Sequence, residues 1–273
     1  MILKTDKLNF NFTLFNHLLL YVNYIYFLWL PGKREILMVT VLITGASRGL
    51  GLEFVKQYQK SGAKIFACCR NPENANNLMK LANESDGQTT LFQMDVSNPK
   101  EVLSTAKELN GCNIDYLINN AGILGTDFDQ PMRGAFGSVD YESWEDTMLV
   151  NVLGPFRVCE AFVNHVSGSK NRLMVFVSTH MASITALSEG GFYPYRSSKA
   201  ALNLLVKGLS IDLKDRGIRT LSFHPGWVKT DMGTDSAPVE VSDSISGMRE
   251  VISSYSSPRT GEFINYDGTP YPW

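Results

Sequence analysis

The sequence predicts an α/β protein with a doubly wound, seven-stranded and mostly parallel sheet that carries helices on both faces. Three observations support this prediction. Seven short runs are almost continuously apolar, which is typical of strands buried on both faces in a parallel sheet. Longer amphipathic segments alternate with these runs, as in successive strand–helix units. A glycine-rich turn follows the first run and leads directly into the first amphipathic segment.

The predicted strands are short and rich in Val, Ile, Leu and Phe, and they cover residues 39–44, 64–69, 90–95, 114–119, 173–178, 219–224 and 262–266. The predicted helices repeat apolar side chains at helical spacing, and they cover residues 49–60, 99–109, 141–166, 195–216 and 241–255. No repeat or low-complexity linker divides this pattern, so we expect one domain over residues 38–273. Two long polar loops, 125–139 and 232–241, are expected to wall the substrate site, because ligands of such folds bind beyond the carboxyl ends of the strands.

Composition limits the classes of function. The chain has 273 residues, of which 44% are hydrophobic and 19% charged, as in an ordinary globular protein. Its net charge of −2 argues against a nucleic-acid partner. Cys68, Cys69, Cys112 and Cys159 show neither CxxC spacing nor a metal-binding pattern. We therefore expect free thiols in a reducing compartment, the cytoplasm, and no bound metal.

Residues 1–37 form an N-terminal extension before the first predicted strand. Within it, residues 10–30 are rich in Leu, Phe and Tyr, and a helix that rises about 1.5 Å per residue could span a bilayer core of roughly 30 Å there. Polar residues such as Asn16, His17 and Asn23 interrupt this stretch and are costly in lipid. We favour an upstream extension of a protein whose start is Met38, and a membrane anchor at residues 10–30 is the alternative.

The glycine-rich turn has the pattern Gly45-x-x-x-Gly49-x-Gly51 between a strand and a helix. Glycines there let the main chain approach a pyrophosphate, and the helix N-terminus supplies N–H donors and positive potential. A tight strand–helix turn without a ligand is the alternative. The residues expected to contact a dinucleotide at this turn are Thr44, Gly45, Ser47, Arg48, Gly49, Leu50 and Gly51.

The second predicted strand indicates which dinucleotide binds. An NAD site would place a carboxylate about twenty residues after the glycines, where it binds the ribose 2′-hydroxyl, and none stands there. Arg70 follows this strand instead, and Arg48 lies in the glycine turn. Two guanidinium groups near the adenosine ribose favour a 2′-phosphate, so we expect NADPH. The alternative is that both arginines are solvated surface charges.

Tyr195 and Lys199 stand four residues apart at the start of a strongly helical segment, so their side chains share one helix face. A phenol has a reference pKa of about 10, and we expect the Lys199 ammonium to lower the pKa of Tyr195. The pair could then give a proton to a carbonyl oxygen as hydride arrives, or remove one from an alcohol. Tyr193 lies before Pro194, which is expected to separate it from the helix, and we expect Tyr193 to form a pocket wall. An ordinary helix pair is the alternative.

These motifs, together with the segment Asn119-Asn120-Ala121-Gly122, resemble the short-chain dehydrogenase/reductase family over almost all of residues 38–273. The resemblance implies a Rossmann fold that assembles as a homodimer or homotetramer through the helices bearing Asn151 and Tyr195. It also implies that Asn151 holds a water of a proton relay. The further cofactor contacts that it implies are Asp95, Val96, Asn120, Ala121, Gly122, Tyr195, Lys199, Pro225, Gly226, Val228 and Thr230.

The same resemblance places an auxiliary serine just after the fifth strand, as the second hydroxyl of a Ser-Ser pair. In this chain Ser178 occupies the first position and Thr179 the second. Thr179 keeps a hydroxyl that donates and accepts, but its methyl group restricts χ1 and crowds the substrate. Thr179 is therefore expected to assist Tyr195, and Ser178 is the alternative. His180 and His224 are expected to be structural.

The segments "HPGWVKTDMG" and "FINYDGTPYPW" resemble sniffer-type carbonyl reductases and the related C-factor proteins. The first resemblance implies NADPH-dependent reduction of a reactive aldehyde, ketone or quinone. The second implies a non-catalytic nucleotide-binding protein linked to signalling. An NAD-dependent alcohol dehydrogenase is a further alternative, against which Arg70 and the missing carboxylate argue.

Overall fold

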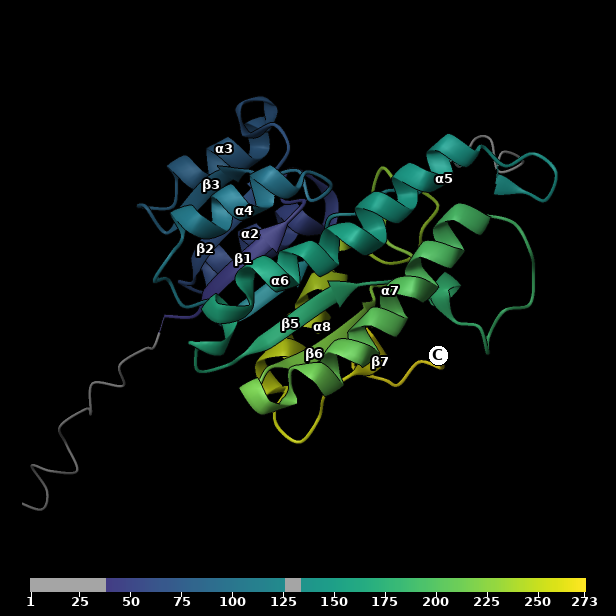
Figure 1. Ribbon diagram of the computed structural model, residues 1–273. Helices are drawn as coiled ribbons and strands as arrows, with labels where there is room; N and C mark the ends of the chain where they lie inside the picture. The colour runs from purple at the N-terminus through teal and green to yellow at the C-terminus, as the bar shows by residue number, and fades with distance from the viewer. Residues whose placement is uncertain (1–37, 126–133) are drawn as a thin grey trace, which may run out of the picture. The chain divides into compact units, whose positions relative to one another are not determined.

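Seven parallel strands form one sheet in the structure, a computed structural model that describes residues 38–125 and 134–273 (Figure 1). The strands are β1 (Thr40–Thr44), β2 (Lys64–Cys69), β3 (Thr89–Gln93), β4 (Tyr116–Asn119), β5 (Leu173–Val177), β6 (Arg219–His224) and β7 (Glu262–Asn265). Their order across the sheet is β3-β2-β1-β4-β5-β6-β7, and each pair of neighbours is parallel. The predicted doubly wound Rossmann fold is confirmed, and the described sheet is parallel throughout.

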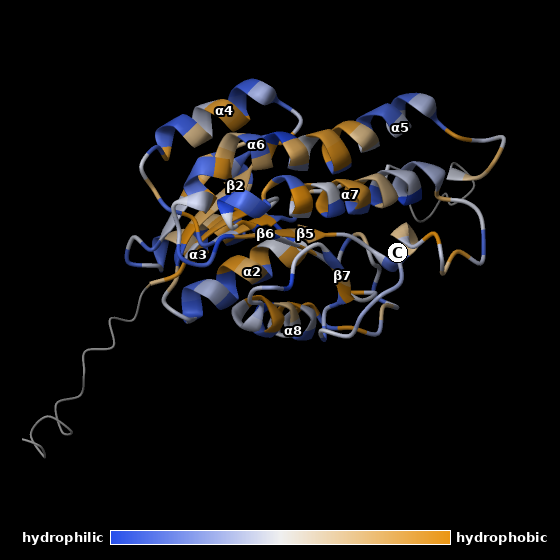
Figure 2. Ribbon diagram, turned by 60° about the horizontal axis from the view of Figure 1, so that its bottom comes forward, coloured by the Kyte–Doolittle hydropathy of each residue, from blue (hydrophilic) through white to orange (hydrophobic). Residues whose placement is uncertain are grey.

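Helices cover both faces of this sheet. The helices are α2 (Gly49–Lys60), α3 (Asn76–Asn83), α4 (Pro99–Glu108), α5 (Tyr141–Met148), α6 (Gly154–Ser167), α7 (Tyr193–Asp212) and α8 (Val241–Ser254). Figure 2 shows α4, α6 and α7 on one face and α2 and α8 on the other. The short α3 was not predicted, because its eight residues cover only about two helical turns, too few for a clear helical repeat of apolar side chains.

Alternate side chains of each central strand enter two separate cores, one under each helix layer. On β1, Val41 and Ile43 belong to the core that includes Phe54 of α2 and Met248 of α8, whereas Leu42 belongs to the opposite core. All five side chains are fully buried, and burying a side chain of this size contributes about 1.5–3 kcal/mol. Burial on both sides explains why the strands appear in the sequence as continuous apolar runs.

The direction of winding reverses beside β1, and this reversal creates the crevice for a ligand. From β1 the chain moves outward to β2 and β3, and it then returns to the other side of β1 with β4. The loops that follow β1 and β4 therefore diverge at their carboxyl ends. In open parallel sheets, ligands bind at this point.

The helix predicted at residues 141–166 is divided into three segments. A π-helical turn, η3 (Leu149–Leu153), separates α5 from α6. Pro155 stands in the first turn of α6 and has no N–H with which to continue regular α-helical bonding. The prediction missed this break because the apolar spacing continues across it.

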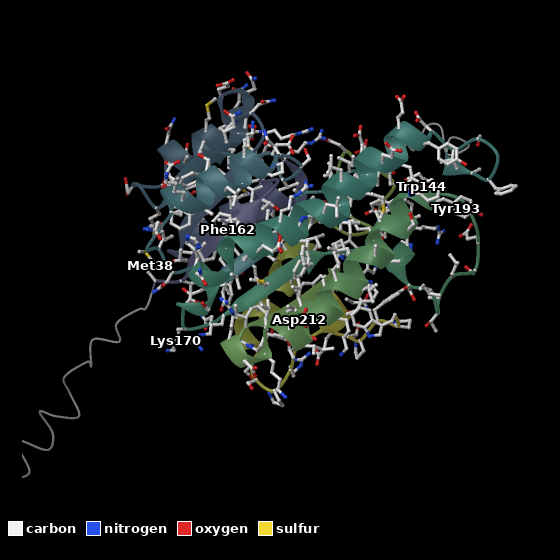
Figure 3. The ribbon with its side chains drawn as sticks, in the orientation of Figure 1. Met38, Trp144, Phe162, Lys170, Tyr193 and Asp212 are labelled. Carbon is white, nitrogen blue, oxygen red and sulfur yellow. The ribbon has the colours of Figure 1, made fainter. Side chains whose placement is uncertain are left out.

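The helix predicted at residues 195–216 begins at Tyr193 and ends at Asp212, the two ends of α7 labelled in Figure 3. Pro194 lies in its first turn, where a missing N–H costs nothing because that N–H would have no helical partner. Pro194 therefore starts the helix, and the expectation that it separates Tyr193 from the helix is wrong. A short 3₁₀ turn, η5 (Lys214–Arg216), follows α7.

Two predictions lie outside the described residues. They are the extension at residues 1–37, with its possible anchor at residues 10–30, and the part of the first long loop at residues 126–133. Within residues 38–125 and 134–273, no helix combines the length and the apolar character that crossing a membrane requires.

Candidate active site

A cavity of about 550 Å³ opens at the carboxyl ends of the central strands. Turns that follow β1 to β6 line it, together with the start of α7. Every predicted cofactor contact lines this cavity except Thr44 and Gly51, and Asn151 also lies outside the lining. The predicted catalytic residues in the lining are Ser178, Thr179, Tyr195 and Lys199.

Two glycines allow the turn after β1 to lie against the end of β4. Gly45 has a φ of +66°, and a Cβ at this position would lie 2.8 Å from the Cα of Ala121. A Cβ on Gly51 would overlap the carbonyl oxygen of Gly45. A side chain at either position would push the turn away from β4. Gly51 therefore shapes the turn from behind the cavity wall, and the direct cofactor contact expected from the sequence stays a prediction.

Thr44 holds the same turn in place by hydrogen bonds. Its hydroxyl accepts from the main-chain N–H groups of Asn120 (3.1 Å) and Ala121 (3.0 Å). The Asn120 side chain donates in return to the carbonyl oxygens of Thr44 (3.0 Å) and Gly45 (3.1 Å). Thr44 is buried behind the turn and joins β1 to β4, and its expected contact with a cofactor stays a prediction.

The two predicted arginines differ in their partners. Arg48 forms an ion pair with Asp231, 3.0 Å between Nη1 and Oδ2, across the mouth of the cavity. Both side chains are about three-quarters exposed, at 75% and 76%, and exposed pairs contribute only about 0–1 kcal/mol. Arg70 has no ion pair with any described residue. Of these two arginines, Arg70 is therefore the one whose guanidinium remains available to an anionic ligand.

A second, polar hollow adjoins the cavity beside Arg70. Its described lining contains no carboxylate, and it consists of Ser47, Arg48, Arg70, Asn71, Asn74, Ala75, Asn76 and Asn77. Amide and guanidinium donors without an acid create a site that suits a phosphate group better than a ribose hydroxyl. This environment agrees with the expectation drawn from the missing carboxylate after the second strand.

The turn after β3 is ordered by its own side chains. Asp95 accepts hydrogen bonds from the main-chain N–H of Ser97 (2.8 Å) and from the Ser97 hydroxyl (2.6 Å). Val96 lies so close to Gly154 that a Cβ there would stand 2.8 Å from Cγ2 of Val96. These contacts present both Asp95 and Val96 to the cavity.

Tyr195 and Lys199 project from α7 into the cavity, and both are buried. The Lys199 ammonium donates to the carbonyl oxygen of Val177 at the end of β5, 2.8 Å away, and lies 5.9 Å from the centroid of the Tyr195 ring. Burial lowers the pKa of Lys199 to about 8. Burial raises the pKa of Tyr195 to about 12, and the hydrogen bond with Thr179 opposes this rise.

The expectation that Lys199 lowers the pKa of Tyr195 is therefore not met in the structure. Loss of hydration penalises a buried phenolate, and the ammonium is directed at Val177 instead of the phenol oxygen. The phenol of Tyr195 stays protonated at neutral pH. This state suits a proton donor.

The two candidate hydroxyls occupy different environments. The Thr179 hydroxyl accepts from the N–H of Met181 (3.3 Å), and it interacts with the Tyr195 phenol closely enough to lower the pKa of that phenol against the effect of burial. The Ser178 hydroxyl is buried and has no partner among the described residues. Thr179 is thus the hydroxyl that interacts with the tyrosine, and its assistance in a reaction stays a prediction.

Asn151 lies in the π-helical turn η3 and is fully buried. Its Oδ1 accepts from the N–H of Ile123 (2.8 Å), and its Nδ2 donates to the carbonyl oxygen of Ile123 (2.8 Å) and to the hydroxyl of Ser198 (3.0 Å). Both donors of the amide are used. The side chain joins the loop after β4 to α7 and so positions the helix that carries Tyr195, while the binding of a relay water by Asn151 stays a prediction.

The arrangement of these residues has counterparts in known proteins. A sequence model described as short chain dehydrogenase matches residues 39–240. The chain belongs to the short-chain dehydrogenase family. It is therefore an oxidoreductase by family, and the resemblance drawn from its motifs is confirmed.

Three similar proteins show where this short-chain dehydrogenase lies within the family. C-signal of Myxococcus xanthus is 41% identical over 160 residues, which are 59% of this chain and 93% of that protein. The carbonyl reductase Sniffer of D. melanogaster has a TM-score of 0.80 at 32% identity, with 86% of this chain and 100% of that chain covered. An NADPH-bound carbonyl reductase from chicken fatty liver has a TM-score of 0.77 at 30% identity, over 86% and 99% of the two chains.

The substrate side of the dehydrogenase cavity contains residues that the sequence analysis did not place there. They are His180, Met181, Glu189, Phe192, Arg196 and Trp227, whereas Met232 belongs to the loop that was expected to wall the substrate site. Tyr193, expected as a pocket wall, is not among the lining residues, and Phe192 takes that place. Phe192 has a φ of +48°, which is uncommon for a bulky residue and typical of strained functional segments. The sequence offered one signal of their position, because His180, Arg196 and Trp227 each directly follow a residue of a recognised motif.

A chain of aromatic rings supports this side of the cavity from behind. The rings of His180 and His224 lie 4.8 Å apart, and those of His224 and Tyr271 lie 5.5 Å apart. Burial lowers the pKa of His224 to about 3, so this imidazole is neutral at physiological pH. Near the same rings, the main-chain oxygen of Trp273 accepts from the N–H groups of Ile184 (2.7 Å) and Thr185 (3.1 Å). The last residues of the chain therefore hold the loop between β5 and α7.

Proposed function

We propose that this short-chain dehydrogenase reduces a small reactive carbonyl compound, an aldehyde, ketone or quinone, to an alcohol with NADPH. The observation that carries the proposal is the contact of Thr179 with a protonated Tyr195 beside Lys199, inside a cavity that begins at the glycine turn. Supporting it, Sniffer and the NADPH-bound chicken protein, which the chain resembles over their whole length, are both described as carbonyl reductases.

The residues of the cavity fit NADPH. The turn at Gly45 presents main chain at a point where a Cβ would clash, which suits close approach of a pyrophosphate. Arg70 has the donors for a 2′-phosphate and no competing ion pair among the described residues. Val228 and Thr230 also line the cavity, and the family resemblance assigns them to the nicotinamide. When bound, NADPH supplies the hydride that the carbonyl carbon accepts.

The protein residues supply the proton and the orientation. Tyr195 gives its phenolic proton to the carbonyl oxygen as that oxygen gains negative charge, and its raised pKa keeps the proton in place until then. The Thr179 hydroxyl orients the phenol and can donate to the same oxygen. Lys199, with a pKa of about 8, is mostly protonated at neutral pH and stabilises the tyrosinate that remains. Proton uptake from solvent then restores Tyr195.

The test compares NADPH and NADH oxidation with a panel of aldehydes, quinones and dicarbonyl compounds. We expect faster turnover with NADPH and a loss of about 10²–10⁴-fold in kcat for Tyr195→Phe, since that variant keeps the ring and loses the proton. Equal rates for the wild type and Tyr195→Phe would contradict the role of Tyr195. Faster turnover with NADH would contradict the role of Arg70, and would favour an NAD-dependent alcohol dehydrogenase.

A second candidate function is a non-catalytic, nucleotide-binding signalling protein. The 41% identity with C-signal favours it. The two candidates separate in one experiment, because a signalling protein of this kind would bind NADPH and turn over none of the carbonyl compounds.

We also propose that the protein is a cytoplasmic homodimer or homotetramer, joined through α6 and α7. Leu204 and Ile211 lie on one face of α7 and are 73% and 67% exposed, and Leu153, just before α6, is 48% exposed. Exposed apolar side chains at this spacing favour a partner helix. Light scattering should give a multiple of the monomer mass, and Leu204→Asp should lower the measured mass.

The four free cysteines suit a reducing compartment. The compartment is tested by comparing how the full chain and a chain that starts at Met38 partition between membranes and buffer.

A further inference from the structure

Arg196 is a charged residue of the cavity wall that the proposed reaction does not use. It directly follows Tyr195 in the first turn of α7 and lines the cavity as a half-buried side chain. Its Nε is buried without a hydrogen-bond partner, and its guanidinium forms no ion pair with any described residue. A buried guanidinium donor that lacks an acceptor is costly, and such groups in native structures call for an explanation. A ligand that arrives in the cavity can supply the acceptor.

The surroundings of Arg196 favour a negative charge on that ligand. Its positive charge, added to burial, helps to lower the pKa of the neighbouring His180. The N-terminus of α7 adds positive potential, and its first turn contains no acidic residue. Glu189 also lines the cavity, but it lies exposed on the loop and is not paired with Arg196.

The cavity that Arg196 lines also has large apolar wall residues. They are Met181, Phe192, Trp227 and Met232. A ligand that satisfies both features has an apolar body and one anionic end. A monovalent carboxylate matches one planar guanidinium fork, whereas a phosphate dianion is usually bound by several cations or main-chain donors.

We propose that Arg196 binds the carboxylate of an oxo-carboxylic acid, so that the preferred substrates are carbonyl compounds with an apolar body and one carboxylate. This inference rests on the proposed carbonyl reduction and adds the class of substrate to it. The carbonyl oxygen meets Tyr195 and Thr179, and the carboxylate meets the guanidinium one residue away in sequence. Hydride and proton transfer are unchanged, because the carboxylate takes no part in bond making.

The test uses two carboxylates, benzoylformate and para-formylbenzoate, each with its methyl ester as a neutral counterpart. The measured quantity is the ratio of kcat/KM for the acid to kcat/KM for the ester. The two acids differ in the distance between carbonyl and carboxylate, so the better one measures the spacing from Tyr195 to Arg196. For at least one pair we expect a ratio above one in the wild type, and a fall of about 10- to 100-fold in Arg196→Gln that resides in KM, because charge-assisted hydrogen bonds contribute to binding by that order.

Two further variants control for charge and folding. Arg216→Gln removes a positive charge from η5, where the side chain contacts Asn164 and does not line the cavity, and should leave the ratio unchanged. Arg196→Lys keeps the charge without the planar fork and should give an intermediate ratio. A ratio near one in the wild type for both pairs, or one that Arg196→Gln leaves unchanged, would overturn the inference while the proposed carbonyl reduction stands.

Calorimetry decides the inference if none of the four compounds is reduced. Benzoate and benzamide are titrated into the full protein with saturating NADP⁺, and we expect benzoate to bind more tightly in the wild type and to lose this advantage in Arg196→Gln. Equal binding of the two compounds would overturn the assignment of Arg196. Absence of turnover would count against the proposed reduction alone.

Discussion

Main-chain atoms form most of the wall at the cofactor end of the cavity, whereas side chains form the wall at the substrate end. At the cofactor end, main chain forms the wall, and Gly45, Thr44 and Asn120 hold that main chain through close contacts and reciprocal hydrogen bonds. At the substrate end, side chains such as Phe192 and Arg196 form the wall at the start of α7, just after a loop that Trp273 holds from the far end of the chain. Main chain recognises what every phosphate shares, whereas side chains can be exchanged one at a time. The comparison teaches that cofactor binding and substrate choice can change independently in this protein.

The largest effect is expected where the main-chain wall is disturbed. Gly51→Ala places a Cβ against the carbonyl oxygen of Gly45 and must move the glycine turn, so we expect loss of measurable NADPH binding and a fall in Tm. The matched control is Gly208→Ala in α7, where a Cβ meets nothing within 4 Å. Alanine there should raise the free energy of unfolding by about 0.5–1 kcal/mol. Unimpaired NADPH binding by Gly51→Ala would refute the account of the cofactor end.

A smaller effect is expected when the Thr179 hydroxyl, which interacts with Tyr195, is removed. Thr179→Ala removes the hydrogen bond to Tyr195 and should lower kcat by about a hundredfold, a typical loss for one positioned donor. Ser178→Ala removes a buried hydroxyl that has no described partner, and it should leave kcat and Tm nearly unchanged. Steady-state kinetics of both variants in parallel checks this contrast. A larger loss in Ser178→Ala would reverse the assignment.

Burial of Lys199 makes the free energy of unfolding of the protein depend on pH. Its pKa falls from 10.5 to about 8 on folding, so between these values the unfolded chain binds more protons than the folded one, and stability rises with pH. Below pH 8 the full cost of burying the ammonium is present, on the order of 3 kcal/mol at most. The Lys199→Met variant should therefore be more stable than the wild type at neutral pH, and its kcat should be lower. Thermal unfolding from pH 7 to 10 should show the difference shrinking, and a constant difference would contradict this.

The smallest effects distinguish the two arginines of the cofactor end. Arg70→Ala should reduce the preference for NADPH over NADH by about tenfold or more, because charge-assisted hydrogen bonds to a 2′-phosphate are lost. Arg48→Ala breaks only the exposed pair with Asp231 and should change the free energy of unfolding by less than about 1 kcal/mol. Denaturant unfolding measures the effect of Arg48→Ala on stability, and the ratio of kcat/KM for the two cofactors measures the cofactor preference of both variants. A larger shift for Arg48→Ala would mean that Arg48 leaves Asp231 to bind the phosphate.

Sequence reasoning was most successful where the relevant residues are neighbours in the chain. The continuous apolar runs identified the parallel sheet, because each strand is buried on both faces. The spacing of Tyr195 and Lys199 on one helix face, and of the glycines between β1 and α2, follows from local geometry, so these groups could be assigned without a structure. The missing carboxylate and Arg70 after β2 likewise belong to one short segment.

Only the tertiary structure decided the properties that depend on segments distant in sequence. The interaction of Thr179 with Tyr195, and its absence at Ser178 among the described residues, requires the turn after β5 to meet α7. Thr44 and Gly51 became supports for the cavity because β1 pairs with β4, which is separated from it by the whole outward loop of the chain. The pKa of Tyr195 rises because packing removes its water, a quantity that no motif records. Spacing along the chain determines which side chains share an element, and packing determines which of them meet, what they exclude and how strongly they hold a proton.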